Sequence, residues 1–280
     1  MKKVVILDGY NSIHRCRFNW GGGSAMDLGP YQMVYNFINL INATARDFSP
    51  DIFYFAIDGK PKARLDLYSE YKGNRKRVDP TEAEIAYWDS FNRQKRIILE
   101  LCRTSIPVTT IYHPDEEADD LAYKYAKIHK DDDVIIITND SDYIQIINEM
   151  SNVQVFNPIK RKYFEKTDYD YVSWKSMVGD PSDNIPGVRR VGKKTADKIL
   201  KNGQLEERLE DESFRSQYEL AYSLIKMRDC FPLAEVEVTN PIFRKQDLSA
   251  AFKEFGFKSF EDGLKLKEMG NNFKNYSDDG

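Results

Sequence analysis

The chain has 280 residues, of which 41% are hydrophobic and 31% charged, with a formal net charge of −4. No apolar run approaches the roughly 20 residues of a membrane-spanning helix, and the composition is ordinary for a globular protein. The three cysteines and three histidines are scattered, which disfavours a disulfide framework and a histidine-based metal site. We expect a reducing, cytoplasmic compartment.

Short β-rich apolar runs alternate with amphipathic segments in the first part of the chain. The expected strands are residues 4–7, 52–57, 107–111, 134–138 and 153–156. The expected helices between them include residues 31–48, 90–102 and 117–129. This alternation predicts a mostly parallel sheet covered by helices on both faces, whose ligands bind at the carboxyl ends of the strands. From about Asp168 the strand signal fades and the chain is predicted to be helical.

Carboxylates follow four of the predicted strands, directly or at the start of the next helix. In chain order they are Asp8, Asp58, Glu117, Asp119, Asp120, Asp140 and Asp142. Each alone could be a helix cap or a turn residue. Together, at one edge of a parallel sheet, they would repel one another strongly unless a cation is bound. Hard divalent ions such as magnesium relieve that repulsion, and two of them can promote hydrolysis of a phosphodiester.

Two basic elements offset the acidic balance locally. Residues 60–96 carry lysines and arginines interleaved with aromatic rings, a pattern suited to a nucleic-acid strand. Gly187 and Gly192 bound a tight turn that opens a helix with Lys193 and Lys194. Glycines let a backbone approach a phosphate closely, and helix N-termini offer free N–H groups to it. Solvated lysines on an ordinary helical hairpin are the alternative for this turn.

Five segments resemble, in order and spacing, the motifs of the 5′ nuclease family. They are residues 8–11 followed by Arg15, 57–59, 117–120, 138–142 and 179–187. The family includes flap endonucleases, the 5′ nuclease domain of bacterial DNA polymerase I, and the stand-alone exonucleases and RNase H enzymes of bacteriophages. The resemblance extends from Lys2 to about Leu200 and is closest in form to the bacteriophage enzymes.

The resemblance implies a role for each matching position. Nine acidic residues would hold metal, directly or through water: Asp8, Asp58, Glu117, Asp119, Asp120, Asp140, Asp142, Asp180 and Asp183. In an arch at residues 60–96, Arg64, Lys72 and Arg75 would neutralise charge at the scissile phosphate. The expected nucleic-acid-binding residues are Arg15, Tyr71, Gly187, Arg189, Arg190, Gly192, Lys193 and Lys194. Tyr71 would stack on a base, and the turn at 187–192 would belong to a helix–three-turn–helix that can enclose K⁺.

We therefore expect an α/β fold with a central, mostly parallel sheet flanked by helices, a helical arch and a C-terminal helix–three-turn–helix part. The expected division is a catalytic domain at residues 1–167, including the arch at 60–96, and a helical DNA-binding part at 168–280.

The expected activity is two-metal hydrolysis of DNA near 5′ ends or flaps, in primer removal during replication or in repair. Two Mg²⁺ would serve, with Mn²⁺ as a substitute, and the RNA of RNA–DNA hybrids is a further expected substrate. A non-catalytic protein that binds branched DNA and a single-strand ribonuclease with a related acidic sheet are the alternatives. A stand-alone monomer is expected, with a replication clamp or single-strand-binding protein as candidate partners.

Overall fold

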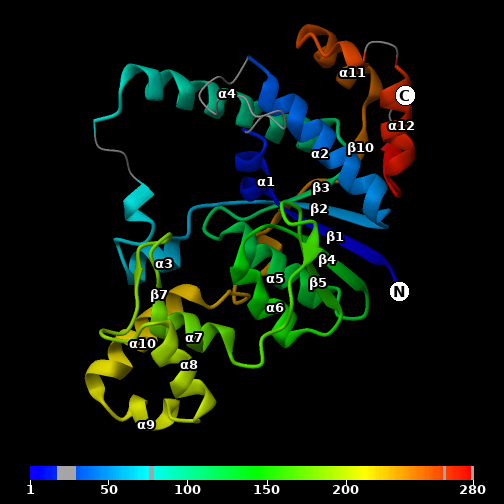
Figure 1. Ribbon diagram of the computed structural model, residues 1–280. Helices are drawn as coiled ribbons and strands as arrows, with labels where there is room; N and C mark the ends of the chain where they lie inside the picture. Colours follow the sequence, from blue (N-terminus) through cyan, green and yellow to red (C-terminus); the bar gives the residue numbers. More distant parts are fainter. Residues whose placement is uncertain (18–29, 76–78, 261–262, 279–280) are drawn as a thin grey trace.

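The computed structural model describes residues 1–17, 30–75, 79–260 and 263–278 (Figure 1). Its main sheet has seven strands in the order β6-β5-β4-β1-β2-β3-β9. The five central strands are parallel, and they are β1 (Lys3–Asp8), β2 (Ile52–Ile57), β3 (Thr109–Tyr112), β4 (Asp133–Ile137) and β5 (Val153–Asn157). β6 (Lys162–Tyr163) and β9 (Glu237–Val238) pair antiparallel at the two edges. The expected α/β class and mostly parallel sheet are confirmed.

Helices cover both faces of the sheet (Figure 1). Val5 and Leu7 point into one core with α2 (Gln32–Phe48) and α4 (Glu82–Thr104), while Val4 and Ile6 point into the other. The second core is closed by α5 (Ala118–Ile128) and α6 (Ile144–Glu149). A strand buried on both faces has no polar side, which explains the continuous apolar run at residues 4–7.

Two element boundaries differ from the expected ones for local reasons. β3 begins at Thr109, two residues later than expected, and Pro107 has no N–H to donate to a strand ladder. α4 begins at Glu82, eight residues before the expected start, because Thr81 and Glu84 form a reciprocal capping box.

The C-terminal part contains α7 (Tyr171–Val178), a small hairpin of β7 (Gly179–Asp180) and β8 (Ile185–Pro186), and three further helices. These are α8 (Lys193–Lys201), α9 (Leu205–Leu209) and α10 (Glu212–Ile225). The base of the arch, α3 (Lys62–Leu67), packs on α10 (Figure 1). A buried cluster that includes Tyr71, Ile185 and Leu224 joins these elements. The hairpin is therefore packed against α10 and the residues that follow α3.

The last described segment, which lies beyond the part of the chain that carries the motif resemblance, packs against the first core. It contains β10 (Ile242–Phe243), α11 (Lys245–Glu254), α12 (Leu264–Asn272) and β11 (Ser277–Asp278). Phe257 and Phe260 contact Tyr35 of α2, so this segment covers the outer side of α2. Short elements complete the chain: α1 (Gly9–Arg15) and 3-10 turns at Gly73–Arg75, Ser141–Tyr143, Leu233–Glu235 and Lys258–Phe260. Within the described residues, every helix is too short or too polar to cross a bilayer.

Candidate active site

Asp8 and Asp58 lie at the carboxyl ends of β1 and β2. Asp8 caps α1 by accepting from Asn11 N at 3.2 Å, and its other oxygen accepts from Thr138 Oγ1 at 2.9 Å. Asp58 Oδ1 accepts from Ala118 N at 3.1 Å, whereas Asp58 Oδ2 is buried and no donor of the described residues reaches it. A buried carboxylate oxygen without a donor matches what a hard cation would bind. Burial and the charge of Asp8 raise the pKa of Asp58 to about 7.

The raised pKa of Asp58 predicts a pH dependence of stability in metal-free buffer. Folded Asp58 keeps its proton up to about pH 7, whereas the unfolded chain releases it near 3.8. Its stabilising contribution is therefore present below about pH 4 and is lost as the pH rises through about 7. Asp58→Asn removes this titration. The melting temperature of the variant minus that of wild type should therefore be several degrees larger at about pH 8 than at about pH 5. Melting in EDTA at both pH values measures this, and a constant difference would contradict it.

Glu117 and Asp119 stand at the start of α5, beside Asp120. One carboxylate oxygen from each of the three lies within 4.8 Å of the others, which is close enough to share a cation. Burial and the charges of Asp120 and Glu117 raise the pKa of Asp119 well above its usual range. Glu117 behaves oppositely: burial would raise its pKa, but Lys72 and Arg64 outweigh burial and lower it.

Arg64 is placed differently from the expected phosphate contact. Its side chain is only 2% exposed and forms a two-pronged pair with Asp120, whose side chain is fully buried. Arg64 Nη1 also donates to Glu117 Oε2 at 2.9 Å. Its Nε donates to the carbonyl of Leu224 at 2.9 Å, which ties α3 to the end of α10. With these partners, the buried guanidinium does not reach a phosphate at the protein surface. Arg64 instead holds Glu117 and Asp120 in place at the carboxyl ends of the strands.

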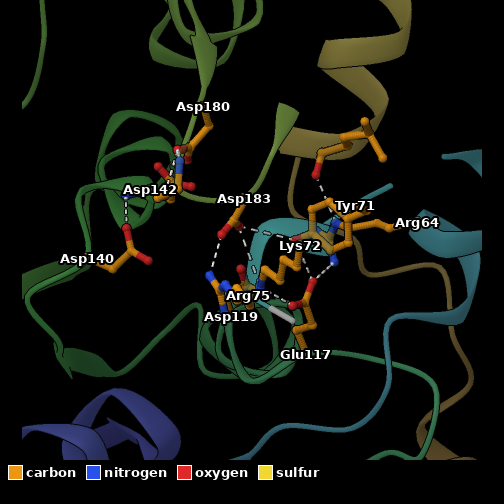
Figure 2. A network of polar contacts seen from close by, with 12 residues as sticks. Arg64, Tyr71, Lys72, Arg75, Glu117, Asp119, Asp140, Asp142, Asp180 and Asp183 are labelled. Atoms are coloured by element: carbon orange, nitrogen blue, oxygen red, sulfur yellow. Dashed lines mark hydrogen bonds and ion pairs between the residues drawn. The ribbon is translucent and has the colours of Figure 1, made fainter. Parts of the chain in front are cut away.

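The side chains of Tyr71 and Lys72 lie beside Arg64 and Glu117 in the site (Figure 2). Tyr71 is 5% exposed and donates to Glu117 Oε2 at 2.9 Å, so its ring is not presented to a base as expected. Lys72 adopts a left-handed φ of 54° and donates its N–H to the carbonyl of Asp183 at 2.8 Å. Its ammonium pairs with Glu117 and lies 3.5 Å from Asp183 Oδ2. Arg75 also pairs with Asp183 and is 57% exposed, far more than Arg64 or Lys72.

A second acidic group lies on the other side of Asp183 (Figure 2). Asp140 and Asp142 follow β4, where Asp140 Oδ1 caps the next turn by accepting from Asp142 N at 2.9 Å. Lys175 of α7 pairs with Asp142, and its Nζ lies 2.6 Å from Asp180 Oδ2. Burial and the charge of Asp140 raise the pKa of Asp142 to about 6. The structure thus gathers both acidic groups around the hairpin loop.

Lys175 is the site residue that the sequence interpretation missed. It is the one basic residue among the mostly apolar residues 171–178, and in the structure it is buried. A lysine at an otherwise buried helical position usually faces a carboxylate, because an unpaired buried ammonium is costly. That local signal could have directed attention to Lys175.

The expected nucleic-acid-binding residues of the helical part are exposed, with one exception. Arg189, Arg190, Lys193 and Lys194 are accessible, and no side chain caps α8 at Gly192. Gly187 has a packing reason instead, since a Cβ there would lie 2.4 Å from the carbonyl carbon of Val178.

Arg15 of α1 lies apart from these residues. Its side chain is half-buried, and its Nη1 donates to no acceptor among the described residues. Burial lowers its pKa from the usual value, but an arginine stays charged near neutral pH. It can therefore still bind an anion.

Comparisons with known proteins give consistent results. The family model of the 5′-3′ exonuclease N-terminal resolvase-like domain matches residues 3–176, and that of the 5′-3′ exonuclease C-terminal SAM fold matches residues 167–249. A thermostable DNA polymerase I of Thermus caldophilus is 30% identical over 75% of this chain, which spans only 25% of that protein. The flap endonuclease of Escherichia phage T5 is 29% identical, covering 71% of this chain and 70% of that protein.

A similar fold is found among solved structures. The T5 5′-exonuclease with bound divalent zinc ions superimposes with a TM-score of 0.63 and 26% identity, covering 80% of this chain and 88% of that one.

Proposed function

Because the chain belongs to the 5′-3′ exonuclease family, we propose that it hydrolyses phosphodiester bonds of DNA near 5′ ends or flaps with the help of two divalent ions, Mg²⁺ or Mn²⁺. One observation carries the proposal: acidic residues from four strands and a hairpin converge at one edge, and Asp183 lies between the two groups (Figure 2). The RNA of RNA–DNA hybrids is a proposed further substrate.

The donor set fits divalent ions. Two groups of carboxylates would hold them, with Asp183 between the two. Asp8, Asp58, Glu117 and Asp119 form one group, and Asp140, Asp142 and Asp180 form the other. Carboxylates with coordinated water are what magnesium prefers. Bound ions would supply Lewis acidity for attack of water on phosphorus. Asp120 is the exception, because its side chain is fully buried and Arg64 engages both of its oxygens. The oxygens of Glu117 are also engaged, by Arg64, Tyr71 and Lys72, so Glu117 would have to give up part of these contacts to bind an ion.

The chain's own cations would serve the phosphate. Lys72 and the exposed Arg75 lie beside Asp183, where they can neutralise charge that develops on the reacting phosphate. Arg64 and Tyr71 act indirectly, because both hold Glu117 in place. We therefore assign Lys72 and Arg75 to the substrate and Arg64 and Tyr71 to positioning.

The proposed division of labour follows the expected domains. Residues 1–167, with the arch at 60–96, would cut. Within residues 168–280, the helices α7 to α10 would grip duplex DNA, whereas β9 and the segment after it pack against the catalytic part. The exposed N-terminus of α8 suits a phosphate. Any K⁺ ion would have to be held by carbonyl oxygens of the preceding turn instead. Such contacts recognise shape rather than base sequence.

A cleavage assay tests the proposal. We expect a 5′-labelled flap DNA to be cut in Mg²⁺ or Mn²⁺ and to stay intact in EDTA. A blunt duplex and an RNA–DNA hybrid in parallel report the range of substrates. Tight binding of the flap without cutting in any of these ions would instead establish a non-catalytic branched-DNA-binding protein.

The grip of α8 should appear in the salt dependence of binding. Lys193→Ala with Lys194→Ala should weaken duplex binding equally for unrelated sequences. The slope of log affinity against log salt should become shallower by about 0.9 for each lost phosphate contact. Fluorescence anisotropy in Ca²⁺ over a range of salt measures this slope, with Lys162→Ala, on the exposed edge strand β6, as the control. An unchanged slope would place both lysines in solvent.

A further inference from the structure

Lys175 joins two parts of the site through one ammonium group. Asp142 belongs to the turn after β4, whereas Asp180 belongs to the hairpin that follows α7. The ammonium pairs with Asp142 and lies 2.6 Å from Asp180 Oδ2, while the Lys175 side chain is only 11% exposed. Lys175 is thus a buried cation between two carboxylates that come from different elements.

The helix that carries Lys175 is firmly anchored. Asp170 caps the N-terminus of α7 by accepting from Val172 N at 3.0 Å and Ser173 N at 3.3 Å. One turn before Lys175, the Tyr171 hydroxyl lies 3.2 Å from Asp142 Oδ1. Because the backbone of this helix is fixed, pairing has to order only the side chain of Lys175, and its ammonium reaches the two carboxylates from one direction.

The charge of Lys175 persists despite its burial. Burial lowers the pKa of an ammonium. For Lys175, the charge of Asp142 and the hydrogen bonds that the ammonium donates to Asp142 and Asp180 outweigh burial and raise the pKa above the usual value. The same ammonium and Ser182 hold the pKa of Asp180 below its usual range, against the effect of burial. The pair of carboxylates is therefore already neutralised in part by the chain itself.

We propose that Lys175 is a tethered cation that competes with a divalent ion for Asp142 and Asp180, and so sets how tightly this part of the site holds metal. An ammonium only donates, so the carboxylate oxygens that it engages are withdrawn from a metal. Two cations at the same carboxylates also repel each other. The inference rests on the proposed function, since it concerns the same metal-binding site.

The competition gives Lys175 two effects of opposite sign. Without metal, it relieves the repulsion between Asp142 and Asp180 and fastens the hairpin to the sheet edge. When a divalent ion binds, the ammonium must give up at least part of its contacts. Lys175 therefore stabilises the metal-free protein and weakens metal binding, and a purely structural lysine would do only the first.

Replacement of Lys175 by an uncharged residue separates these effects. Lys175→Met keeps the length of the side chain, and Lys175→Gln keeps a hydrogen-bond donor in case the methionine variant does not fold. Both should melt at a lower temperature than wild type in EDTA. Both should bind Mn²⁺ at least about tenfold more tightly, as removal of one nearby positive charge at an effective dielectric constant near 20 predicts. Electron paramagnetic resonance of free Mn²⁺ measures the affinity without any substrate.

Lys127 offers a matched control. It lies at the other end of α5 from Glu117, and its ammonium also bridges two carboxylates, Asp229 at 2.8 Å and Glu149 at 3.7 Å. Lys127→Met should bind Mn²⁺ as wild type does. Lys175→Arg, which keeps the positive charge, should gain less Mn²⁺ affinity than Lys175→Met. Unchanged or weaker Mn²⁺ binding by folded Lys175→Met and Lys175→Gln would overturn the inference about Lys175 but would leave the proposed metal site standing. Absence of Mn²⁺ binding by wild type would overturn the proposed metal site itself.

Discussion

Asp140→Asn is expected to slow cleavage of a 5′-flap DNA by at least about a hundredfold to a thousandfold, the range found when one electrostatic group at a transition state is lost. The fold should survive, because an asparagine oxygen can still accept from Asp142 N. Burial, with the charges of Asp8 and Asp183, raises the pKa of Asp140, so loss of its charge relieves repulsion in the metal-free protein. Asp140→Asn should therefore melt above wild type in EDTA.

Single-turnover cleavage and melting in EDTA test both halves of this prediction. Asp133→Asn is the control, because Asp133 begins β4 at the end of the strand remote from the acidic edge. It should leave the cleavage rate unchanged. A cleavage rate for Asp140→Asn near that of wild type would remove Asp140 from the active site.

Arg64→Met should produce the largest loss of stability, about 3–5 kcal/mol, the usual cost of leaving one buried charge without its partner. The buried carboxylates of Asp120 and Glu117 would lose the guanidinium that they share. The double variant Arg64→Met with Asp120→Leu removes both charges of the closest pair and should recover much of the loss. Urea denaturation of the three proteins gives the free energies of unfolding.

The neighbouring acids provide the matched comparison for this pair. Asp119→Asn should not destabilise the metal-free protein, because Asp119 suffers repulsion from Asp120 and Glu117. Asp120→Asn should destabilise it, because Arg64 would lose the closer of its two buried counter-charges. Equal free energies of unfolding for Asp119→Asn and Asp120→Asn would show that the Arg64–Asp120 ion pair does not stabilise the protein.

The sheet and its acidic edge could be predicted from sequence because both follow from local patterns. A continuous apolar run ends at Asp8, and a parallel sheet then places that residue beside Asp58 and Asp140 whatever the details of packing. The family resemblance, now supported by the matched models, added the hairpin acids Asp180 and Asp183. The roles of these acids remain predictions.

The partners of the basic residues could not be predicted in this way. Arg64 and Arg75 belong to the same basic stretch of sequence, yet one is buried against Asp120 and the other is largely exposed. That choice depends on α10, more than 140 residues away along the chain, whose carbonyl at Leu224 receives Arg64. The packing of Phe257 and Phe260 on α2 likewise joins segments too distant for any periodicity to connect.

The bond from Arg64 to the end of α10 also bears on where a substrate would be cut. α3, α5 and α10 share this guanidinium, and α7 packs against α10 and against α8. The helix α8 that we propose for duplex binding and the acidic residues are thus linked through packed helices and a buried ion pair. If the proposed function holds, the cut would fall a fixed number of nucleotides from the duplex that α8 binds, whatever the base sequence between them.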